Sequence, residues 1–361
     1  MSASPEVAGA GPVREEDAFD ADRVAEWLRR ASPRAHGLEG TPEVLQFHGG
    51  ASNLTYLLRY PSGRDLVLRR PPTGTKARGA HDMRREHDIQ AALAPVFAPV
   101  APMVAFCADE DVVGSEFYVM ERLEGVVLRQ DLPPGLGLDE EAVGALCRAA
   151  VDTLVALHEV DVEAAGLAHL DRGEGYVARQ VGGWSERYRR ARTPDVPDLE
   201  TTMAWLDAHR PPDRPHTLIH NDFRFDNLVL DPEDPTRVVG VLDWEMATVG
   251  DPLMDLGGAL AYWVQADDDP AFLALRRQPT HTPGMLTRTE VLERYGKARG
   301  EHVDPDQWRF YEVFGLFRLA VIAQQIYFRF HHGQTTNPAY GAFREVVTHL
   351  DARCSRLVRA H

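Results

Sequence analysis

Lysine is almost missing from this chain of 361 residues: only two of its 39 basic side chains are lysine, Lys76 and Lys297. Chemistry that needs a lysine, as a Schiff base or as a grip on phosphate, therefore has two candidates. Basic side chains are also outnumbered by 55 acidic ones, which gives a net charge of −16. This excess of negative charge argues against a broad surface that binds nucleic acid or an anionic membrane.

Cysteine is scarce as well, with three residues at Cys107, Cys147 and Cys354 and no CxxC pair. Such an odd, widely spaced set fits neither a disulfide framework nor a cysteine-rich zinc site, and it suits a reducing compartment. The sequence has no run of about 18 consecutive apolar residues and no apolar signal-peptide core near its start. We therefore expect a soluble, cytoplasmic protein with no membrane or nucleic-acid partner.

The first third of the chain has the pattern of an antiparallel sheet with one helix. Three strands run through VLQFHGGASNLTYLLRY and DLVLRRPP, and a helix and two further strands are expected at 81–93, 104–107 and 117–121. We predict that residues 41–125 form one domain. Residues 1–40 are expected to be a flexible N-terminus plus a short helix that Asp20 caps.

The remainder, residues 126–361, is expected to be mainly helical, for example over 140–158 and 199–209. One β-rich stretch interrupts it, IHNDFRFDNLVLDPEDPTRVVGVLDWE, in which two strand-like runs flank a DPEDPT turn. This pattern predicts a hairpin at about 217–250 inside a helical domain. The expected fold class is therefore α+β, with a small antiparallel-sheet lobe followed by a mainly helical lobe.

Polar residues that suit phosphoryl transfer stand at the ends of this hairpin. In an antiparallel pair the first residue of one strand lies beside the last of its partner, so Asn227 and Asp243 are expected to share a Mg²⁺ ion. Asp222, five residues before Asn227, is placed to accept a proton from an incoming hydroxyl group. His220 is expected to brace that loop by hydrogen bonds. Phosphoryl transfer needs this set: one carboxylate for the nucleophile and two oxygen ligands for the metal.

The segment HNDFRFDN…LDWE resembles the catalytic loop and metal-binding aspartate of aminoglycoside phosphotransferase-like kinases, a branch of the protein-kinase-like fold. Other stretches are most similar to the kinase-like domains found fused to acyl-CoA dehydrogenases: FHGGASNLTYLL, LVLRRPP, MRREHDI, FYVMERLEG and FRLAVIAQQIYFR. The resemblance covers about residues 40–350. It implies a two-lobed kinase-like fold and the use of ATP with Mg²⁺.

A turn of small residues between the first two strands is the expected phosphate loop. It contains Gly49, Gly50, Ser52 and Asn53, and small residues let backbone N–H groups approach phosphate. An ordinary hairpin turn is the alternative. After the FYVMERLEG strand, backbone groups around Glu121 and Leu123 are expected to pair with adenine. Met120 either packs near the adenine or belongs to the core.

Arg69 stands where most kinases of this fold carry the lysine that holds the nucleotide phosphates. Its planar fork keeps the positive charge but changes the geometry at the phosphates. Glu86, on the following helix, is the expected ion-pair partner of Arg69. The alternative is a surface arginine and an unrelated helix glutamate.

The acceptor is expected to be the hydroxyl group of a small molecule. Only seven residues separate Asp243 from Asp251, the expected cap of the next helix, which leaves no room for the long activation segment of protein kinases. The irregular segment 266–286 is a candidate lid. The candidate acceptor contacts, for which capping or solvated positions are the alternative, are Asp251, Arg318, Gln325 and Arg329.

Two classes of function stay open at this point. The first is an ATP- and Mg²⁺-dependent O-phosphotransferase, acting on a cationic aminoglycoside or on an anionic hydroxyacyl-CoA or hydroxy acid. The second is a catalytically degenerate, nucleotide-binding regulatory protein. The arginine at position 69 favours the second class, whereas the intact Asp222, Asn227 and Asp243 favour the first. The sequence does not distinguish ATP from GTP.

Overall fold

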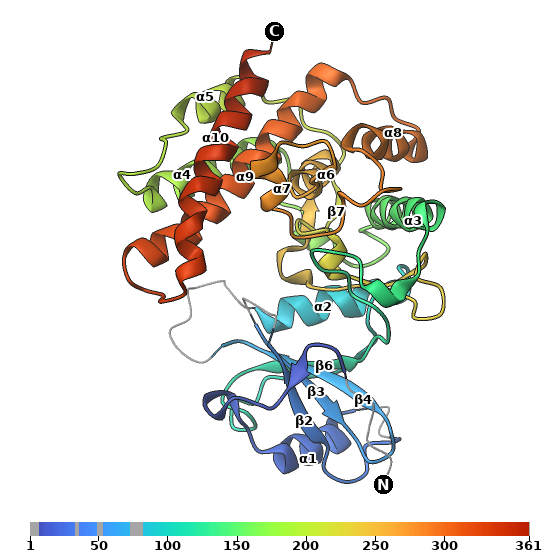
Figure 1. The fold of residues 1–361 in the computed structure, drawn as a ribbon. Helices are drawn as coiled ribbons and strands as arrows, with labels where there is room; N and C mark the ends of the chain where they lie inside the picture. The colour runs from blue at the N-terminus through green and yellow to red at the C-terminus, as the bar shows by residue number, and fades with distance from the viewer. Residues whose placement is uncertain (1–6, 33–35, 49–52, 73–81, 361) are drawn as a thin grey trace. The chain divides into compact units, whose positions relative to one another are not determined.

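The structure is a computed structural model that describes residues 7–32, 36–48, 53–72 and 82–360. The chain divides into two compact units. The unit that we call the sheet unit contains residues 1–124 and 240–245, and the one that we call the helical unit contains residues 125–239 and 246–361. Figure 1 shows the elements of both units, coloured along the chain.

The sheet unit is built on one antiparallel sheet of six strands in the order β1-β2-β3-β4-β6-β5. The predicted succession of three strands, a helix and two more strands is confirmed. The register places Arg69 opposite Thr55 on one neighbouring strand and Tyr118 on the other. The elements of this unit are β1 (Ala10–Gly11), α1 (Ala21–Ala31), β2 (Glu43–Phe47), β3 (Leu54–Arg59), β4 (Asp65–Arg70), α2 (Met83–Leu93), β5 (Met103–Cys107) and β6 (Phe117–Glu121).

The core of the sheet unit lies between the sheet and α1. Alternate apolar residues of β3, β4 and β6 share one face of the sheet, as the two-residue period of a strand requires, and pack against Val24 and Leu28. Asp20 caps α1 as predicted, because its carboxylate accepts the N–H groups of Asp22 and Arg23. The sheet is thereby fixed on one side.

The N-terminal segment forms structure where the sequence predicts flexibility. Strand β1 pairs with β2 at the edge of the sheet. Arg70, which is 3% exposed, donates to the carbonyl groups of Asp17 at 2.6 Å and Val113 at 2.7 Å. A buried guanidinium needs acceptors, and the backbone of the N-terminal segment supplies one of them. This long-range contact left no pattern in the local sequence.

The helical unit contains the predicted helix over 140–158 and the predicted strand pair, together with α4, which the sequence pattern did not reveal. Strands β7 (Thr217–Ile219) and β10 (Thr248–Gly250) pair antiparallel, and β8 (Leu228–Leu230) pairs with β9 (Val238–Val241), whose last two residues are counted with the sheet unit. The helices are α3 (Glu140–His158), α4 (Tyr176–Ala191), α5 (Glu200–Ala208), α6 (Pro252–Ala261), α7 (Pro270–Ala274), α8 (Arg288–Arg299), α9 (Pro305–His331) and α10 (Phe343–Arg359).

Helices α6 and α9 approach each other through a pair of glycines. A methyl group on Gly257 would lie 2.5 Å from the Tyr311 carbonyl oxygen, and one on Gly315 would lie 2.1 Å from the Gly257 carbonyl oxygen. Within the described residues, α9 alone is long and apolar enough to cross a membrane, but 61% of its apolar stretch is buried, as in a core helix. The close approach makes α9 the centre of the helical unit.

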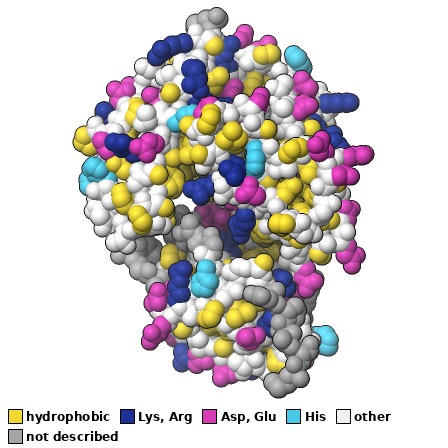
Figure 2. Space-filling view, viewed as in Figure 1, with side chains coloured by type: hydrophobic (Ala, Val, Ile, Leu, Met, Phe, Trp, Pro, Cys, Tyr) yellow, Lys and Arg dark blue, Asp and Glu magenta, His cyan; other side chains and the backbone are white. Residues whose placement is uncertain are grey.

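Acidic and basic side chains are interspersed on the face that Figure 2 shows. The net negative charge is therefore not gathered into one uniform patch on that face. Short-range pairs of opposite charge in such a mixture contribute little to stability individually. Removing one partner of a buried ion pair affects stability more than removing one partner of such a surface pair.

The glycine contact between α6 and α9 predicts that Gly315→Ala destabilises the protein. The added methyl group meets backbone rather than a flexible side chain, so the helices must separate, at a cost of about 1–3 kcal/mol. Gly182→Ala on α4 is the matched control, since a methyl group there meets nothing within 4 Å and should stabilise by about 0.5–1 kcal/mol. Urea denaturation measures both. Equal effects of the two substitutions would contradict the glycine contact.

Candidate active site

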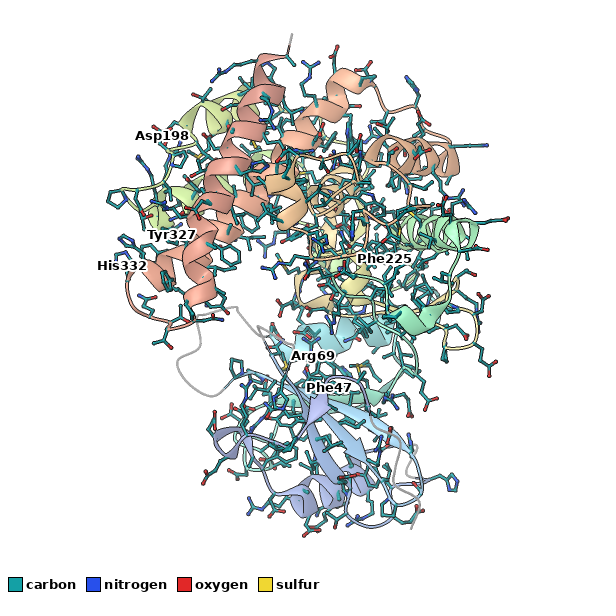
Figure 3. All side chains as sticks on the ribbon, viewed as in Figure 1. Phe47, Arg69, Asp198, Phe225, Tyr327 and His332 are labelled. Carbon is teal, nitrogen blue, oxygen red and sulfur yellow. The ribbon has the colours of Figure 1, made fainter. Side chains whose placement is uncertain are left out.

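An ion pair between Arg69 and Glu86 lies at the centre of the polar residues of the sheet unit. Arg69 Nη1 on β4 lies 3.2 Å from Glu86 Oε2 on α2 (Arg69 is labelled in Figure 3). Glu86 is 1% exposed and also accepts the Tyr118 hydroxyl and the Asn53 amide, each at 2.9 Å. The expected ion pair is therefore present, and two further donors hold its carboxylate in place.

Arg69 pairs with Asp243 as well, a contact that the sequence did not predict. Arg69 Nη2 lies 3.1 Å from Asp243 Oδ1, so the guanidinium fork serves two carboxylates at once. Asp243 has a φ of 67°, in the left-handed region that residues other than glycine rarely adopt. Strained backbone of this kind is concentrated at functional sites. The Asp243 side chain is 34% exposed, which keeps it accessible to a ligand.

Residues 240–245 belong to the sheet unit although they are remote in sequence from the rest of it. The Val241 N–H donates to the Pro99 carbonyl at 2.8 Å, and Arg85 Nη1 donates to the Glu245 carbonyl at 3.0 Å. The Trp244 side chain is fully buried. These contacts place Asp243 beside Arg69, which precedes it by 174 residues.

Burial and charge act in opposite directions on this cluster. Burial raises the pKa of Glu86, while the charge of Arg69 and the Tyr118 hydrogen bond oppose that rise. For Arg69, burial lowers the pKa, but Tyr118, Glu86 and Asp243 together raise it above its ordinary value. Arg69 therefore stays charged, and a change that removes it leaves a buried carboxylate without its counter-charge.

The remaining residues predicted to bind the nucleotide have mixed outcomes. Gly49, Gly50 and Ser52 lie outside the described residues. The side chain of Asn53 is 5% exposed and donates to Glu86, so it supports the ion pair, and the approach of its backbone N–H to phosphate stays a prediction. Met120 is 7% exposed and packs in a buried apolar cluster, as the core alternative required.

At the predicted adenine edge, Glu121 does not offer its backbone N–H to a nucleotide. Its backbone N–H donates to the Pro102 carbonyl at 2.9 Å, and its carboxylate pairs with Arg64 at 2.5 Å. The N–H of Arg122 donates to the Asp65 carbonyl at 3.4 Å. Pairing of adenine with this segment therefore stays a prediction for Leu123 and the carbonyl groups.

The cluster predicts that Arg69→Met destabilises the sheet unit by about 3–5 kcal/mol, because Glu86 is then buried without its partner. Since the pKa of Glu86 is already raised by burial, loss of Arg69 raises it further. A carboxyl group with a raised pKa favours the folded state once protonated, so the deficit should shrink from about pH 8 to about pH 5.

Thermal denaturation across that pH range measures the deficit. Arg30→Met is the control, because Arg30 makes only an exposed pair with Glu26 on α1, which is worth less than about 0.5 kcal/mol. A deficit for Arg69→Met that equals the control, or that grows as the pH falls, would contradict this account of the cluster.

In the helical unit, one carboxylate, that of Asp255, anchors the backbone of the loop of residues 220–227. Asp255 of α6 accepts the backbone N–H of His220 at 2.7 Å and that of Asn221 at 2.8 Å. His158 of α3 lies 3.1 Å from the same carboxylate through Nε2, and its Nδ1 lies 2.7 Å from the Tyr295 hydroxyl of α8. All of these side chains except Asn221 are at most 2% exposed.

Asp255 stays ionised in this setting. Burial raises its pKa, but the hydrogen bond and charge of His158, with the N–H of His220, lower it below its ordinary value overall. The carboxylate can then accept every donor that points at it. The 220–227 loop is thus fixed by three helices, which supply Tyr295, His158 and Asp255.

Asp222 is held within this loop but remains accessible. Its carboxylate lies 3.1 Å from Arg224 Nε and 3.1 Å from Arg224 Nη2, and its side chain is 22% exposed. Its backbone N–H donates to His220 Nδ1 at 3.2 Å, so His220 braces the loop as expected. Arg224 also lies 3.4 Å from Asp226 and over the Tyr262 ring. A carboxylate with fixed orientation and open access suits a proton acceptor.

The orientation of Asn227 follows from its donors. Its amide nitrogen donates to the Asp222 carbonyl at 2.8 Å and to Asp222 Oδ2 at 3.0 Å. Only the nitrogen of a carboxamide can donate, so the oxygen is the atom that is available to a cation. Asn227 belongs to the helical unit and Asp243 to the sheet unit, so their joint binding of a metal stays a prediction.

Two predictions on the acceptor side are corrected. Asp251 is 1% exposed, caps α6 through the Leu253 N–H at 2.8 Å and accepts the Tyr311 hydroxyl at 2.9 Å, so it is a structural cap. The candidate lid, 266–286, is packed rather than loose, since Gln278 is 1% exposed and accepts the Phe225 N–H at 2.9 Å. Gln325 and Arg329 are exposed, and their contact with an acceptor stays a prediction.

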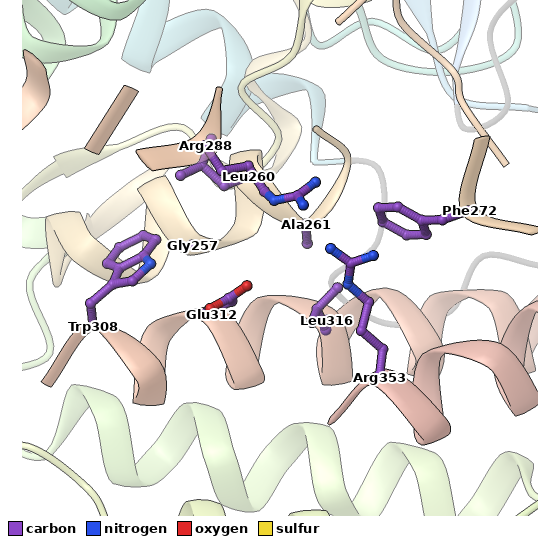
Figure 4. A pocket seen from close by; sticks show the side chains of 9 residues that line it. All are labelled: Gly257, Leu260, Ala261, Phe272, Arg288, Trp308, Glu312, Leu316 and Arg353. Atoms are coloured by element: carbon purple, nitrogen blue, oxygen red, sulfur yellow. The ribbon is translucent and has the colours of Figure 1, made fainter. Parts of the chain in front are cut away.

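The helical unit has two hollows whose linings leave out Asp222. The one in Figure 4 is open to solvent and measures about 310 Å³ with the solvent at its mouth; it lies beside α6 and α9, and its charged lining is Arg288, Arg353 and Glu312. Both arginines pair with Asp268, and no lining residue comes from the 220–227 loop. The other, of about 360 Å³, borders that loop and is lined mainly by apolar side chains. Neither hollow includes Asp222 itself.

Sequence reasoning missed several residues that hold this site. Arg224 and Asp226 stand inside HNDFRFDN, and their alternating charges around Asp222 are the signal that would have found them. His158, Asp255 and Tyr295 come from three separate helices. A lone buried histidine or aspartate in a helix carries no sequence signal for such a contact.

The model of the phosphotransferase enzyme family matches residues 43–311 of this chain. The chain therefore belongs to the phosphotransferase enzyme family, as the resemblance of HNDFRFDN…LDWE implied. The sheet unit and the helical unit are the two lobes of its protein-kinase-like fold. Family and fold thus place the chain among the kinase-like phosphotransferases.

Relatives of known sequence and structure agree with this assignment. Acyl-CoA dehydrogenase family member 10 of Mus musculus is 36% identical over 90% of this chain and 30% of its own length. Family member 11 of Homo sapiens is 33% identical over 86% of this chain and 39% of its own length. The chain spans less than half the length of these curated relatives. A crystal structure from Ralstonia eutropha JMP134, described as a candidate aminoglycoside phosphotransferase, is 30% identical with a TM-score of 0.78, over 95% of this chain and 99% of that one.

Proposed function

We propose that the protein transfers the γ-phosphoryl group of ATP to the hydroxyl group of a small molecule, with Mg²⁺ as cofactor. The acceptor oxygen bonds to the γ-phosphorus as the bond to the leaving oxygen of ADP breaks. The hydroxyl proton passes to the Asp222 carboxylate. Arg69 binds the phosphates, and Glu86 holds Arg69 in position.

One observation carries the proposal: the Asp222 carboxylate is oriented by two donors from within its own loop. Arg224 Nη2 and Asn227 Nδ2 both donate to Oδ2 of the carboxylate, and Asp255 accepts the N–H of the preceding residue, Asn221. A base held in this way needs little rearrangement when the acceptor binds. A degenerate regulatory protein has no need to keep that arrangement intact.

The residues present suit Mg²⁺. The amide nitrogen of Asn227 donates to Asp222, so the carboxamide oxygen of Asn227 is available to a cation. Asp243 offers a partly exposed carboxylate. Oxygen ligands of this kind are those that Mg²⁺ prefers. When bound, Mg²⁺ offsets the negative charge of the phosphates. We assign it to Asn227 and Asp243, as the sequence predicts.

For the acceptor, we favour a hydroxyacyl-CoA or hydroxy acid over an aminoglycoside. Support comes from the relatives at 36% and 33% identity, which are named acyl-CoA dehydrogenase family members. The solved structure named for aminoglycosides, at 30% identity, supports the other class. We also propose a reducing, cytoplasmic location, supported by three cysteines that are buried and free.

We predict that Asp222→Asn lowers kcat about 10²–10⁴-fold, because the amide cannot accept the proton. ADP release measured with Mg-ATP over an aminoglycoside, a series of hydroxy acids and their CoA thioesters gives kcat and identifies the acceptor class. Asp234→Asn, at an exposed position of the hairpin turn, is the matched control and should stay within about twofold.

ATP binding, followed by isothermal calorimetry, should persist in Asp222→Asn. Retention of full transfer by this variant would remove Asp222 from the role of base. Binding of Mg-ATP by the wild type, with no transfer to any member of the panel, would favour the regulatory class of function.

A further inference from the structure

Arg318 of α9 is a buried arginine without an ion-pair partner in the part of the chain that the structure describes. Arg318 is 6% exposed, and no carboxylate among the described residues lies within ion-pair distance of its guanidinium. Its Nε is buried and makes no hydrogen bond within that part of the chain. A buried charge of this kind costs stability, so its retention needs an explanation.

The guanidinium of Arg318 points at the 220–227 loop. Nη2 donates to the carbonyl oxygen of Asn221 at 2.6 Å and lies 3.7 Å from the Met246 sulfur. The cation lies 5.2 Å from the centre of the Trp184 ring, which provides an electron-rich face in place of a carboxylate. Its strongest bond is therefore to the peptide group that joins Asn221 to Asp222.

A glycine leaves room for this arrangement. A methyl group on Gly258 of α6 would lie 2.8 Å from Arg318 Nη1, closer than a carbon atom and a nitrogen atom approach. The close approach of α6 and α9 at Gly257 and Gly315 brings Arg318 against α6 one turn later. The same two helices thus supply Asp255 and Arg318 to the 220–227 loop.

The peptide that Arg318 contacts is under conformational strain. Asn221 has a φ of 65°, in the left-handed region. Its N–H donates to Asp255 at 2.8 Å, and its side-chain amide donates to the Met246 carbonyl at 3.0 Å. Strain of this kind persists only where surrounding contacts hold it. The Arg318 bond is the one that holds the carbonyl group.

We propose that Arg318 is a positioning residue for phosphoryl transfer: through the Asn221 carbonyl it fixes the peptide that precedes Asp222, and with it the direction of the Asp222 carboxylate. This inference rests on the proposed function. It differs from the acceptor contact that the sequence predicts for Arg318, because the guanidinium is buried and turned to the backbone. A small shift of Asp222 would misplace the base without abolishing nucleotide binding.

The test compares Arg318→Met, Arg318→Lys and Gly258→Ala with Arg309→Met, a control on the same helix whose arginine pairs only with Asp306 on the surface. Steady-state ADP release from Mg-ATP, with water as acceptor, gives kcat and KM. We expect Arg318→Met to lower kcat about 100-fold with KM for ATP within about threefold. Arg318→Lys should recover to within about tenfold of wild type, and Gly258→Ala should fall between them.

Hydrogen exchange on the nucleotide-free protein gives a second readout. In Arg318→Met, amides of the 220–227 loop should exchange at least about tenfold faster, while those of α3 and α10 stay unchanged. Faster exchange throughout the helical unit, or equal losses for the Lys and Met variants, would show a merely structural role and overturn the proposal.

The two readouts separate this proposal from the one on which it rests. A wild-type protein that neither binds nor hydrolyses Mg-ATP would overturn the proposed function, while exchange confined to the loop would still support the contact role of Arg318. Unchanged kcat and unchanged exchange in Arg318→Met would overturn the positioning role alone.

Discussion

The 220–227 loop takes its conformation from a carboxylate that water does not reach. Asp255 accepts two consecutive backbone N–H groups of that loop, and His158 and Tyr295 behind it fix its orientation. Because the Asp255 charge is buried, these hydrogen bonds form in a medium of low polarity and are strong. The loop therefore has few alternative conformations. The positions of Asp222 and Asn227 depend on this anchor.

Both units apply the same physical device. Each places a non-glycine residue of the site in left-handed backbone, Asn221 in the helical unit and Asp243 in the sheet unit, and in each an arginine with a mostly buried side chain binds that residue. The arginines suit this task because a guanidinium presents several donors in a fixed plane. The near absence of lysine therefore has a local meaning: Arg69 joins Glu86 and Asp243 at once, which a compact ammonium does less well.

Local sequence patterns predicted the local structure well. The alternation in the strands, the caps at Asp20 and Asp251, and the ion pair of Arg69 with Glu86 all follow from spacing and residue type. What could not be predicted depends on contacts between distant segments: the N-terminal strand, the packed 266–286 segment, and the burial of Asp251 and Arg318. In each case a polar group meets a polar partner from another element, and such a contact leaves no period in the sequence.

Asp255 is expected to act on catalysis through Asp222, and a double-mutant cycle measures this coupling directly. Steady-state ADP release from Mg-ATP would be measured for Asp222→Asn, Asp255→Asn and the double variant, with circular dichroism to confirm that each is folded. Residues that act as one unit lose activity only once. The account predicts that the double variant falls within about threefold of Asp222→Asn alone; a loss equal to the product of the two single losses would contradict it.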